Sequence, residues 1–408
     1  MSATASLPGM KATLMRGGTS KCWVFAEDDL DRATSDRDAM LVRLFGSPDV
    51  RQIDGIGGGT STTSKVALLR PSAVPGVDVD YTFGQVSLTE PIVDWRSNCG
   101  NCSAVVGLYA LLAGWLPPRG DTTTVRVLNR NTGQLLRQQV PTPGLRVVNG
   151  GDSAIAGVPY PSLGVTVGFV DPGGRTTGRL FPTGRPIEHL NDGVADIDVT
   201  LIDAGAPVVA AEAAAFGLDG TEAAAVLDSK PSVLRRLETM RTAAARRMGL
   251  VPDDQDVPRA IPKVVLVAPP AQHRELAGQQ RPADGHDLSA RMLSMGRTHP
   301  ALAVTGSVAL ALAATTPETV VARNLARPAG SRALRLATPA GVFPVWVEPS
   351  ADGPIVSVLR TARRLLVADL DLPVPHAAER APDAPRTPLA HAVLDDERHG
   401  NAPAASRG

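Results

Sequence analysis

The chain has 408 residues, a length that favours two domains, and 43% of them are hydrophobic, enough for two cores. Lys plus Arg equals Asp plus Glu at 41 each and aromatic residues make up 3%, which argues against a nucleic-acid partner. We see no signal peptide, no apolar run long enough for a membrane span, and too few cysteines (three) for a disulfide framework. We therefore expect a cytoplasmic protein that acts on a small molecule, without a membrane partner.

Short runs of alternating apolar and polar residues recur along the chain and predict strands. In chain order they are KATLMRG, KCWVFA, DYTFGQVSL, TTVRVLNR, LRVVNGG, LGVTVGFV, DVTLIDA, KVVLVAP, ALRLATPAGVFPVWVE and IVSVLRTA. Helical spacing predicts helices at 36–45, 99–115, 221–227, 232–248, 287–295 and 306–314. Because these helices are too few for regular strand–helix alternation, we predict antiparallel or mixed sheets packed on a few helices.

Two of the predicted helices, CGNCSAVVGLYALLAGW and TGSVALALAATT, are apolar on nearly every side. A helix of this kind is buried all round. Each begins with glycine and polar residues, so its first N–H groups could hold a carboxylate. This pattern suggests two similar halves, each a sheet around one central helix, with both helix starts at a shared cleft. Two unrelated core helices are the alternative that the pattern leaves open.

The glycine- and proline-rich segment DPGGRTTGRLFPTGRP, residues 171–186, is the predicted boundary between the halves. We therefore predict domains at residues 1–185 and 186–373. Residues 374–408 are rich in proline, alanine and charge without periodicity, which predicts a disordered tail.

Two glycine-containing segments, RGGTSK and DGIGGGTSTTSK, are candidate anion-binding loops. Their candidate ligand-binding residues are Thr19, Ser20, Lys21, Gly59, Thr60 and Ser61. The second segment lacks the glycine spacing of nucleotide-binding loops, so a smaller anion is favoured. It ends at Lys65, inside an apolar run where partial burial would disfavour the ammonium form and allow the amine to act as a base. An ordinary turn and a solvent-facing lysine remain the alternatives.

The segment SNCGNCSAVVG places Cys99 and Cys102 three residues apart at a predicted helix start. A zinc site would need further ligands, and the seven histidines include no suitably spaced pair near it. A redox dithiol usually follows a strand in a strand–helix–strand unit, which is missing here. At the helix start the dipole would lower the pKa of Cys99, whereas Cys102 lies one turn further into the helix. We predict one reactive thiol and one packing thiol.

The motifs RGGTSK, DGIGGGTSTTSK, VDWRSNCGN, PTGRP, TLIDAGAP, MGRTHPALAVTGS and RTARRL, in this order, resemble the PrpF family of isomerases over about residues 11–373. That family includes the methylaconitate isomerase accessory protein, methylitaconate and aconitate Δ-isomerases and 4-oxalomesaconate tautomerase. The resemblance implies an α+β, diaminopimelate-epimerase-like fold of two pseudo-symmetric domains, each a curved, mainly antiparallel sheet around a central helix. Three positions depart from the family pattern: Cys102 replaces a non-cysteine residue, Trp23 replaces an often smaller residue, and Ala206 replaces the usual asparagine.

The resemblance also implies proton transfer at carbon without a cofactor or metal, with Lys65 and Cys99 as the catalytic pair and Ser20 near the substrate. Such a pair would catalyse a 1,3-allylic proton shift, seen as double-bond migration or cis/trans isomerisation, in an unsaturated di- or tricarboxylate such as aconitate or methylaconitate. The further candidate substrate-binding residues are Asn98, Gly100, Asn101, His299, Thr305, Gly306 and Ser307.

Several alternatives stay open at this point. The chain could be a keto–enol tautomerase of the oxalomesaconate type, a two-base racemase, or a non-catalytic carboxylate-binding accessory protein to a dehydratase. The sequence does not determine which of Lys65 and Cys99 removes the proton, nor the substrate. A homodimer is a candidate assembly.

Overall fold

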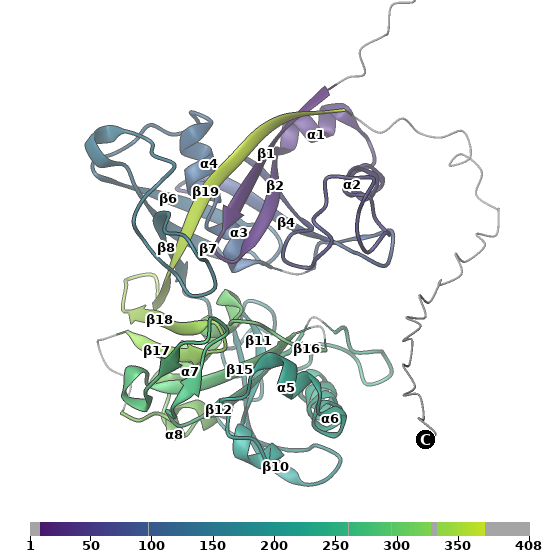
Figure 1. The fold of residues 1–408 in the computed structure, drawn as a ribbon, viewed down its shortest axis with the longest axis vertical. Helices are drawn as coiled ribbons and strands as arrows, with labels where there is room; N and C mark the ends of the chain where they lie inside the picture. Colours follow the sequence, from purple (N-terminus) through teal and green to yellow (C-terminus); the bar gives the residue numbers. More distant parts are fainter. Residues whose placement is uncertain (1–8, 97, 260, 295, 328–332, 372–408) are drawn as a thin grey trace, which may run out of the picture. The chain divides into compact units, whose positions relative to one another are not determined.

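The computed structural model describes residues 9–96, 98–259, 261–294, 296–327 and 333–371, which form a mixed fold of helices and, mostly, strands (Figure 1). The predicted tail at 374–408 lies outside these residues. No helix among the described residues is long and apolar enough to cross a membrane.

The strands of the first half close into a ring. Their bounds are β1 (Gly9–Gly17), β2 (Ser20–Ala26), β3 (Lys65–Pro71), β4 (Val79–Val86), β5 (Val93–Asp94), β6 (Thr122–Asn129), β7 (Leu135–Pro141), β8 (Leu163–Val170) and β19 (Ile355–Asp371). Pairing runs from β1 through β2, β3, β4, β6, β7, β8 and β19 back to β1. Along β6 buried residues alternate with less buried ones, because successive side chains of a strand point to opposite faces. The ring therefore has an apolar interior.

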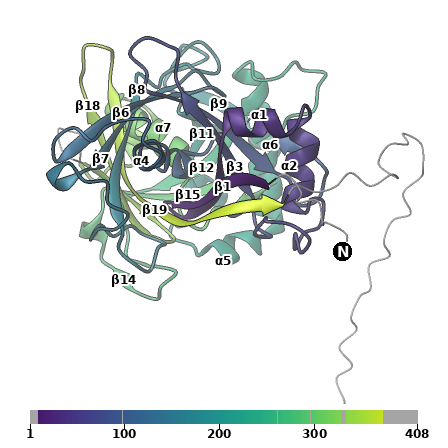
Figure 2. The same cartoon turned by 90° about the horizontal axis from the view of Figure 1, so that it is seen from above.

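Helices α3 (Gly100–Ser103) and α4 (Val106–Leu112) fill this interior, and Figure 2 shows α4 inside the ring. The predicted single helix at 99–115 is thus two helices, because the chain turns tightly at Ala104 and Val105. Helices α1 (Glu27–Ala33) and α2 (Arg37–Phe45) pack on the outer side of the sheet in a separate apolar cluster. The α2 helix agrees with the prediction.

The second half repeats the pairing order of the first. Its elements are β9 (Glu188–Asn191), β10 (Asp196–Ala204), β11 (Ala206–Glu212), α5 (Ala224–Asp228), α6 (Pro231–Arg247), β12 (Lys263–Ala268), β13 (His273–Arg274), β14 (Gln280–Arg281), β15 (Leu288–Ser294), β16 (Arg297–Thr298), α7 (Val304–Thr315), α8 (Val320–Arg323), β17 (Leu334–Thr338) and β18 (Gly341–Glu348). Successive strand pairs follow the same order in both halves: antiparallel, parallel, antiparallel, parallel, antiparallel, antiparallel. The strands are β1-β2-β3-β4-β6-β7-β8 in the first half and β10-β11-β12-β15-β17-β18-β19 in the second. In each series the second parallel pair is joined through a buried helix, α3 with α4 in one and α7 in the other.

Helix α7 is buried from Val304 to Ala314, as its all-round apolar sequence predicted. It shares one hydrophobic cluster with α4, while α6 packs with β10, β11 and β12 in another. Both apolar segments predicted as core helices are buried, although the first is the pair α3 and α4. The division into domains at residue 185 stays a prediction, and β19, although last in the chain, pairs with β1 and β8 of the first half.

Two predicted elements are wrong. The helix expected at 287–295 is the strand β15, whose Leu288, Ala290 and Met292 join the cluster around α7 while Leu293 joins the cluster around α6. A strand buried on both faces loses its alternation and is easily mistaken for a buried helix. The run LRVVNGG forms no strand; there Asn149 instead exchanges side-chain hydrogen bonds with the backbone of Arg364.

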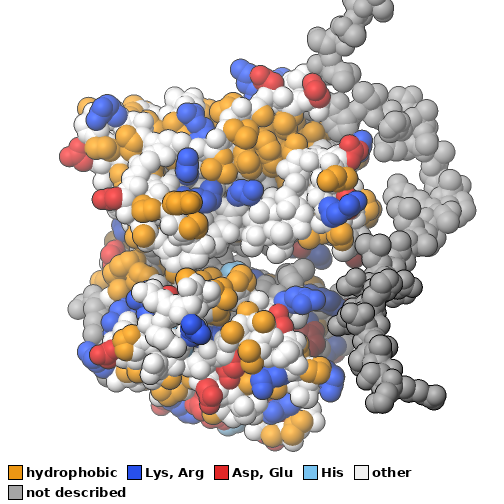
Figure 3. Space-filling model, viewed as in Figure 1, with side chains coloured by type: hydrophobic (Ala, Val, Ile, Leu, Met, Phe, Trp, Pro, Cys, Tyr) orange, Lys and Arg blue, Asp and Glu red, His pale blue; other side chains and the backbone are white. Residues whose placement is uncertain are grey.

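Hydrophobic side chains gather on one face over β1, β2 and β19 (Figure 3). On β19 itself Leu365, Leu366 and Val367 are exposed.

Candidate active site

Lys65 is the first residue of β3 and lies directly opposite Gln85 on β4. Its side chain is 8% exposed, its Nζ donates a 2.6 Å hydrogen bond to Oε1 of Gln85, and it lies 4.9 Å from the centre of the Phe83 ring. The Nε2 of Gln85 in turn donates to the carbonyl of Ser64 at 2.9 Å. No described carboxylate forms an ion pair with Lys65. A neutral amide therefore orients this amine.

Cys99 caps the N-terminus of α3, and its Sγ accepts the N–H of Cys102 at 3.4 Å. The pKa of Cys99 lies well above its ordinary value because the Cys102 thiol hydrogen-bonds to it and because it is partly buried; the charge of Lys65 and the backbone N–H act in the opposite direction. The predicted lowering is thus wrong, since α3 is four residues long and its dipole is small. Cys102 is fully buried in the core, as predicted. Cys99 therefore stays a protonated thiol near neutral pH.

The RGGTSK turn packs against the first turn of α3. A Cβ on Gly17 would clash with the carbonyl oxygen of Asn101, and Nδ2 of Asn101 donates to Oγ1 of Thr19 at 3.1 Å. Ser20 is buried at the start of β2, and the N–H of Lys21 donates to the carbonyl of Thr62 at 2.9 Å. The structure thus brings Thr19 and Ser20 to the helix that Cys99 caps.

In the loop before β3, hydrogen-bond donors bond to another residue of the same loop, Gln52. Oε1 of the buried Gln52 accepts from the N–H of Gly59 at 3.0 Å and from Oγ of Ser64. Thr60 and Ser61 are exposed. Within the described residues no hydrogen bond joins Gly59, Thr60 or Ser61 to α3, and their role in substrate binding stays a prediction. Gln52 was missed because an isolated glutamine carries no sequence signal.

The start of α7 lies against the start of α3, while the cleft expected between them stays a prediction. A Cβ on Gly100 would lie 2.6 Å from Cβ of Val304. The N–H groups of Gly306 and Ser307 both donate to the carbonyl of Ala303 at 3.0 Å, and Oγ of Ser307 donates to Val304. These donors are therefore engaged within α7, and a role of Gly306 and Ser307 in substrate binding stays a prediction. The N–H groups of the first helical positions, Val304 and Thr305, have no intrahelical acceptor.

The Oδ1 of Asn98 accepts a hydrogen bond from Nδ2 of Asn129 at 2.9 Å. This bond holds the segment before Cys99 against the end of β6. Asn101, 9% exposed, remains next to both Cys99 and Thr19.

Lys65 acts electrostatically on two residues of the second half, Lys263 and His299. Burial and the charge of Lys65 lower the pKa of Lys263, the first residue of β12, to about 8, and Cys99 acts on it in the opposite direction. Burial and the charges of Lys263 and Lys65 lower the pKa of His299 to about 4. The Nδ1 of His299 accepts the N–H of Ala301 at 3.0 Å, so the neutral ring carries its proton on Nε2. Lys65, Cys99, Lys263 and His299 thus form one group.

Lys263 was missed because IPKVVLVA reads as an ordinary strand. Its relation to Lys65 depends on which strands pair, which a single sequence does not show.

Arg360 on β19 is a buried cation beside the RGGTSK turn. It is 5% exposed, lies 3.7 Å from the Phe343 ring centre, and its Cδ would be 3.2 Å from a Cβ on Gly18. Its Nη1 donates to the carbonyl of Leu359, its Nε has no partner, and no described carboxylate pairs with it. Burial lowers the pKa of Arg360 to about 9. An unpaired buried cation costs stability, which favours a role in binding an anion.

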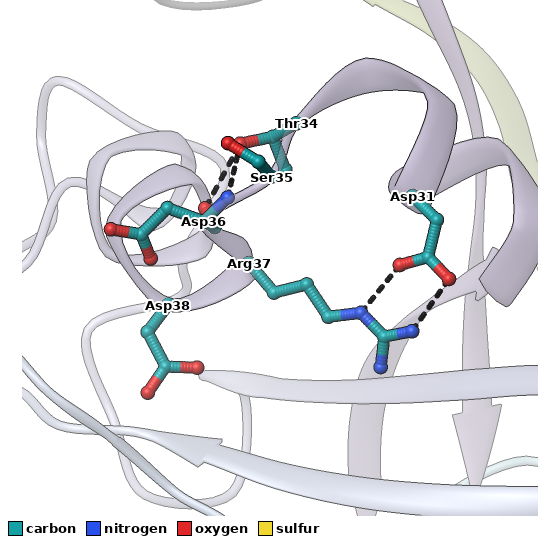
Figure 4. A pocket seen from close by; sticks show the side chains of 6 residues that line it. All are labelled: Asp31, Thr34, Ser35, Asp36, Arg37 and Asp38. Atoms are coloured by element: carbon teal, nitrogen blue, oxygen red, sulfur yellow. Dashed lines mark hydrogen bonds and ion pairs between the residues drawn. The ribbon is translucent and has the colours of Figure 1, made fainter.

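A separate surface depression lies between α1 and α2 (Figure 4), lined by Asp31, Thr34, Ser35, Asp36, Arg37 and Asp38. Arg37 is paired there with Asp31 and Glu27. None of the predicted site residues lines it. In the described part of the chain no three His, Cys, Asp or Glu side chains are grouped to hold a metal ion.

Comparisons with known proteins identify the family of this chain. The PrpF protein family model matches residues 9–373. The 2-methyl-aconitate isomerase of Shewanella oneidensis is 37% identical over 386 residues, covering 89% of this chain and 97% of its own length. The 4-oxalomesaconate tautomerase of Pseudomonas putida is 39% identical, covering 86% of this chain and 93% of its own. The crystal structure of methylitaconate-delta-isomerase superposes with a TM-score of 0.78 at 32% identity, covering 94% of this chain and all of that one. The chain belongs to the PrpF family and is an isomerase.

Proposed function

We propose that the protein catalyses a 1,3-allylic proton shift in an unsaturated di- or tricarboxylate, with Lys65 as the base and Cys99 as the acid. The observation that carries this assignment is the raised pKa of Cys99 beside Lys65. A thiol that holds its proton is suited to donate one, which leaves the amine of Lys65 as the group that removes one.

The proton balance is simple. The neutral amine of Lys65 removes a proton from the carbon next to the double bond, and the electron pair spreads into a dienolate on the conjugated carboxylate. The thiol of Cys99 then protonates the carbon two positions away and becomes a thiolate. One proton passes from the Lys65 ammonium to the Cys99 thiolate, which restores both groups. The double bond has moved, and no electrons enter or leave.

The charge of the site supports a polycarboxylate substrate. Lys263 and Arg360 supply cations, and the starts of α3 and α7 supply N–H groups from Gly100, Asn101 and Thr305 for the dienolate oxygen. His299, with its proton on Nε2, adds a neutral donor. These donors matter because acid–base catalysis alone supplies about 10²–10⁴-fold.

The recurring order of strand pairings supports a diaminopimelate-epimerase-like architecture of two pseudo-symmetric domains, with boundaries near residues 185 and 373. In that arrangement Lys65 and Cys99 come from the first domain and the α7 donors from the second.

The test is proton NMR in D₂O with cis- and trans-aconitate, 2-methylaconitates, methylitaconate and oxalomesaconate. We expect deuterium at an allylic carbon of at least one compound, and the labelled compound identifies the substrate. Lys65→Met should lower kcat/KM by at least about 10²-fold, and Cys99→Ser by at least about tenfold.

The matched control is Lys11→Met, which removes an exposed lysine on β1 and should keep wild-type turnover. Binding without any labelling would instead support the accessory-protein alternative. Near wild-type turnover in both Lys65→Met and Cys99→Ser would disprove the proposed pair.

A further inference from the structure

Lys263 occupies in the second half the position that Lys65 occupies in the first. Lys65 begins β3, which runs parallel to β2 and antiparallel to β4; Lys263 begins β12, which runs parallel to β11 and antiparallel to β15. The turn before each parallel pair also packs in the same way: a Cβ on Gly17 would meet the carbonyl of Asn101, and a Cβ on Gly205 the carbonyl of Thr305.

In the same comparison of the two halves, Cys99 corresponds to a residue whose side chain cannot donate or accept a proton. Asn101 corresponds to Thr305 through these contacts, so the helix cap Cys99 corresponds to the cap Ala303. The second half therefore keeps the lysine and lacks the thiol. A two-base racemase would need a thiol or another acid at that cap, so the retained lysine needs a different explanation.

Lys263 also lies at the reacting groups. The side chain passes the first turn of α7, where its Cδ would be 3.9 Å from a Cβ on Gly306. Its charge interacts with Lys65 and Cys99, and it acts on His299 in turn. Burial disfavours the ammonium form of Lys263, and an anionic group beside it favours that form.

We propose that Lys263 binds, as a cation, the substrate carboxylate conjugated to the reacting double bond and so offsets the charge of the dienolate. This inference rests on the proposed allylic proton shift. It assigns the two equivalent lysines different tasks: Lys65 moves the proton, and Lys263 holds the carboxylate that takes up the electron pair.

The first test is binding, which does not depend on turnover. Tricarballylate is a saturated tricarboxylate that cannot undergo the allylic shift, and isothermal titration calorimetry gives its affinity. We expect Lys263→Met to weaken its binding by at least about tenfold, since a buried charge-assisted contact is lost. Lys263→Arg, which keeps the cation, should retain affinity within about threefold of wild type, and Lys11→Met should bind as wild type.

The second test is the pH dependence of tricarballylate binding. Wild-type affinity for tricarballylate should fall as pH rises through about 8, because Lys263 then loses its charge. In Lys263→Arg this loss should shift to higher pH. The other titratable groups that face Lys263 are Lys65 on β3, Cys99 at the cap of α3 and His299 before α7, and all three are unchanged in the variant.

Lys263→Met with wild-type affinity and an unchanged thermal transition overturns the inference, as does an alkaline loss of binding that is identical in wild type and Lys263→Arg. Should Lys263→Met not fold, the pH comparison with Lys263→Arg decides alone. The proposed function fails separately: it is disproved when wild-type protein binds tricarballylate in a Lys263-dependent way yet labels no compound in D₂O.

Discussion

The Nζ of Lys65 donates a 2.6 Å hydrogen bond to Oε1 of Gln85, the residue directly opposite on the neighbouring strand. Gln85 is held by the Ser64 carbonyl, so the amide positions the amine without adding charge.

Gln85→Glu should therefore lower activity at neutral pH. A carboxylate at this place stabilises the ammonium form of Lys65, which cannot remove a proton. We expect kcat/KM at pH 7 to fall by about 10–100-fold and to recover as pH rises. A pH–rate profile checks this, with the exposed Gln255→Glu as the control for added charge. A uniform loss at every pH would show that Gln85 acts through packing instead.

Cys102→Ala should make Cys99 more reactive. The contact with the Cys102 thiol is the largest cause of the raised pKa of Cys99, while the backbone N–H of residue 102 remains in the variant. The pKa of Cys99 should fall towards its ordinary value, and its alkylation by iodoacetamide at pH 8 should accelerate several-fold, as followed by mass spectrometry. In wild type the alkylation rate should climb only well above pH 9. Equal rates in the two proteins at pH 8 would exclude thiol–thiol coupling.

Gly100→Ala should disrupt the contact between α3 and α7. The new Cβ would lie 2.6 Å from Cβ of Val304, too close without a backbone shift. We expect a loss of about 1–3 kcal/mol in the free energy of unfolding, measured by urea titration, together with reduced kcat. Gly150→Ala, where a Cβ meets nothing within 4 Å, is the matched control and should stay within about 0.5 kcal/mol. Similar losses at both glycines would contradict the contact.

Acidification should destabilise the protein between pH 6.5 and 4. Burial lowers the pKa of His299 and of His286 to about 4, so in this window the unfolded chain binds more protons than the folded one and stability falls as pH falls. One such histidine contributes on the order of 3 kcal/mol at most. His286→Gln removes one of these two groups, so Tm should depend less on pH below 6.5. His286 is the one to change because it lies away from Lys65 and contacts His273 and Ser289. An unchanged slope would assign the acid sensitivity to other groups.

The sequence was most informative where one physical signal dominates. The all-round apolar run at 306–314 predicted the buried helix α7, and the alternating run ALRLATPAGVFPVWVE predicted strand structure where β17 and β18 lie. The candidate pair Lys65 and Cys99 rested on ordered family motifs, since either residue alone has an ordinary structural explanation.

The features that the sequence did not predict depend on tertiary structure. β15 is buried on both faces, which removes the alternation that identifies a strand. Lys263 becomes notable only once β12 is seen to correspond to β3. The direction of the pKa shift of Cys99 follows from the position of the Cys102 thiol and from the short length of α3, neither of which the helix pattern predicted.

The ring of strands around α3 and α4 has a consequence for synthesis on the ribosome. β19 closes that ring by pairing with β1 and β8, and Gly9 is opposite Asp371. Roughly 200 residues separate the end of β8 from the end of β19, so at 5–20 residues per second the nascent first half waits roughly 10–40 s for its last strand. Throughout that interval β1 and β8 expose unpaired edges, which favour aggregation. The half that holds Lys65 and Cys99 is thus the first to be made and the last to be completed.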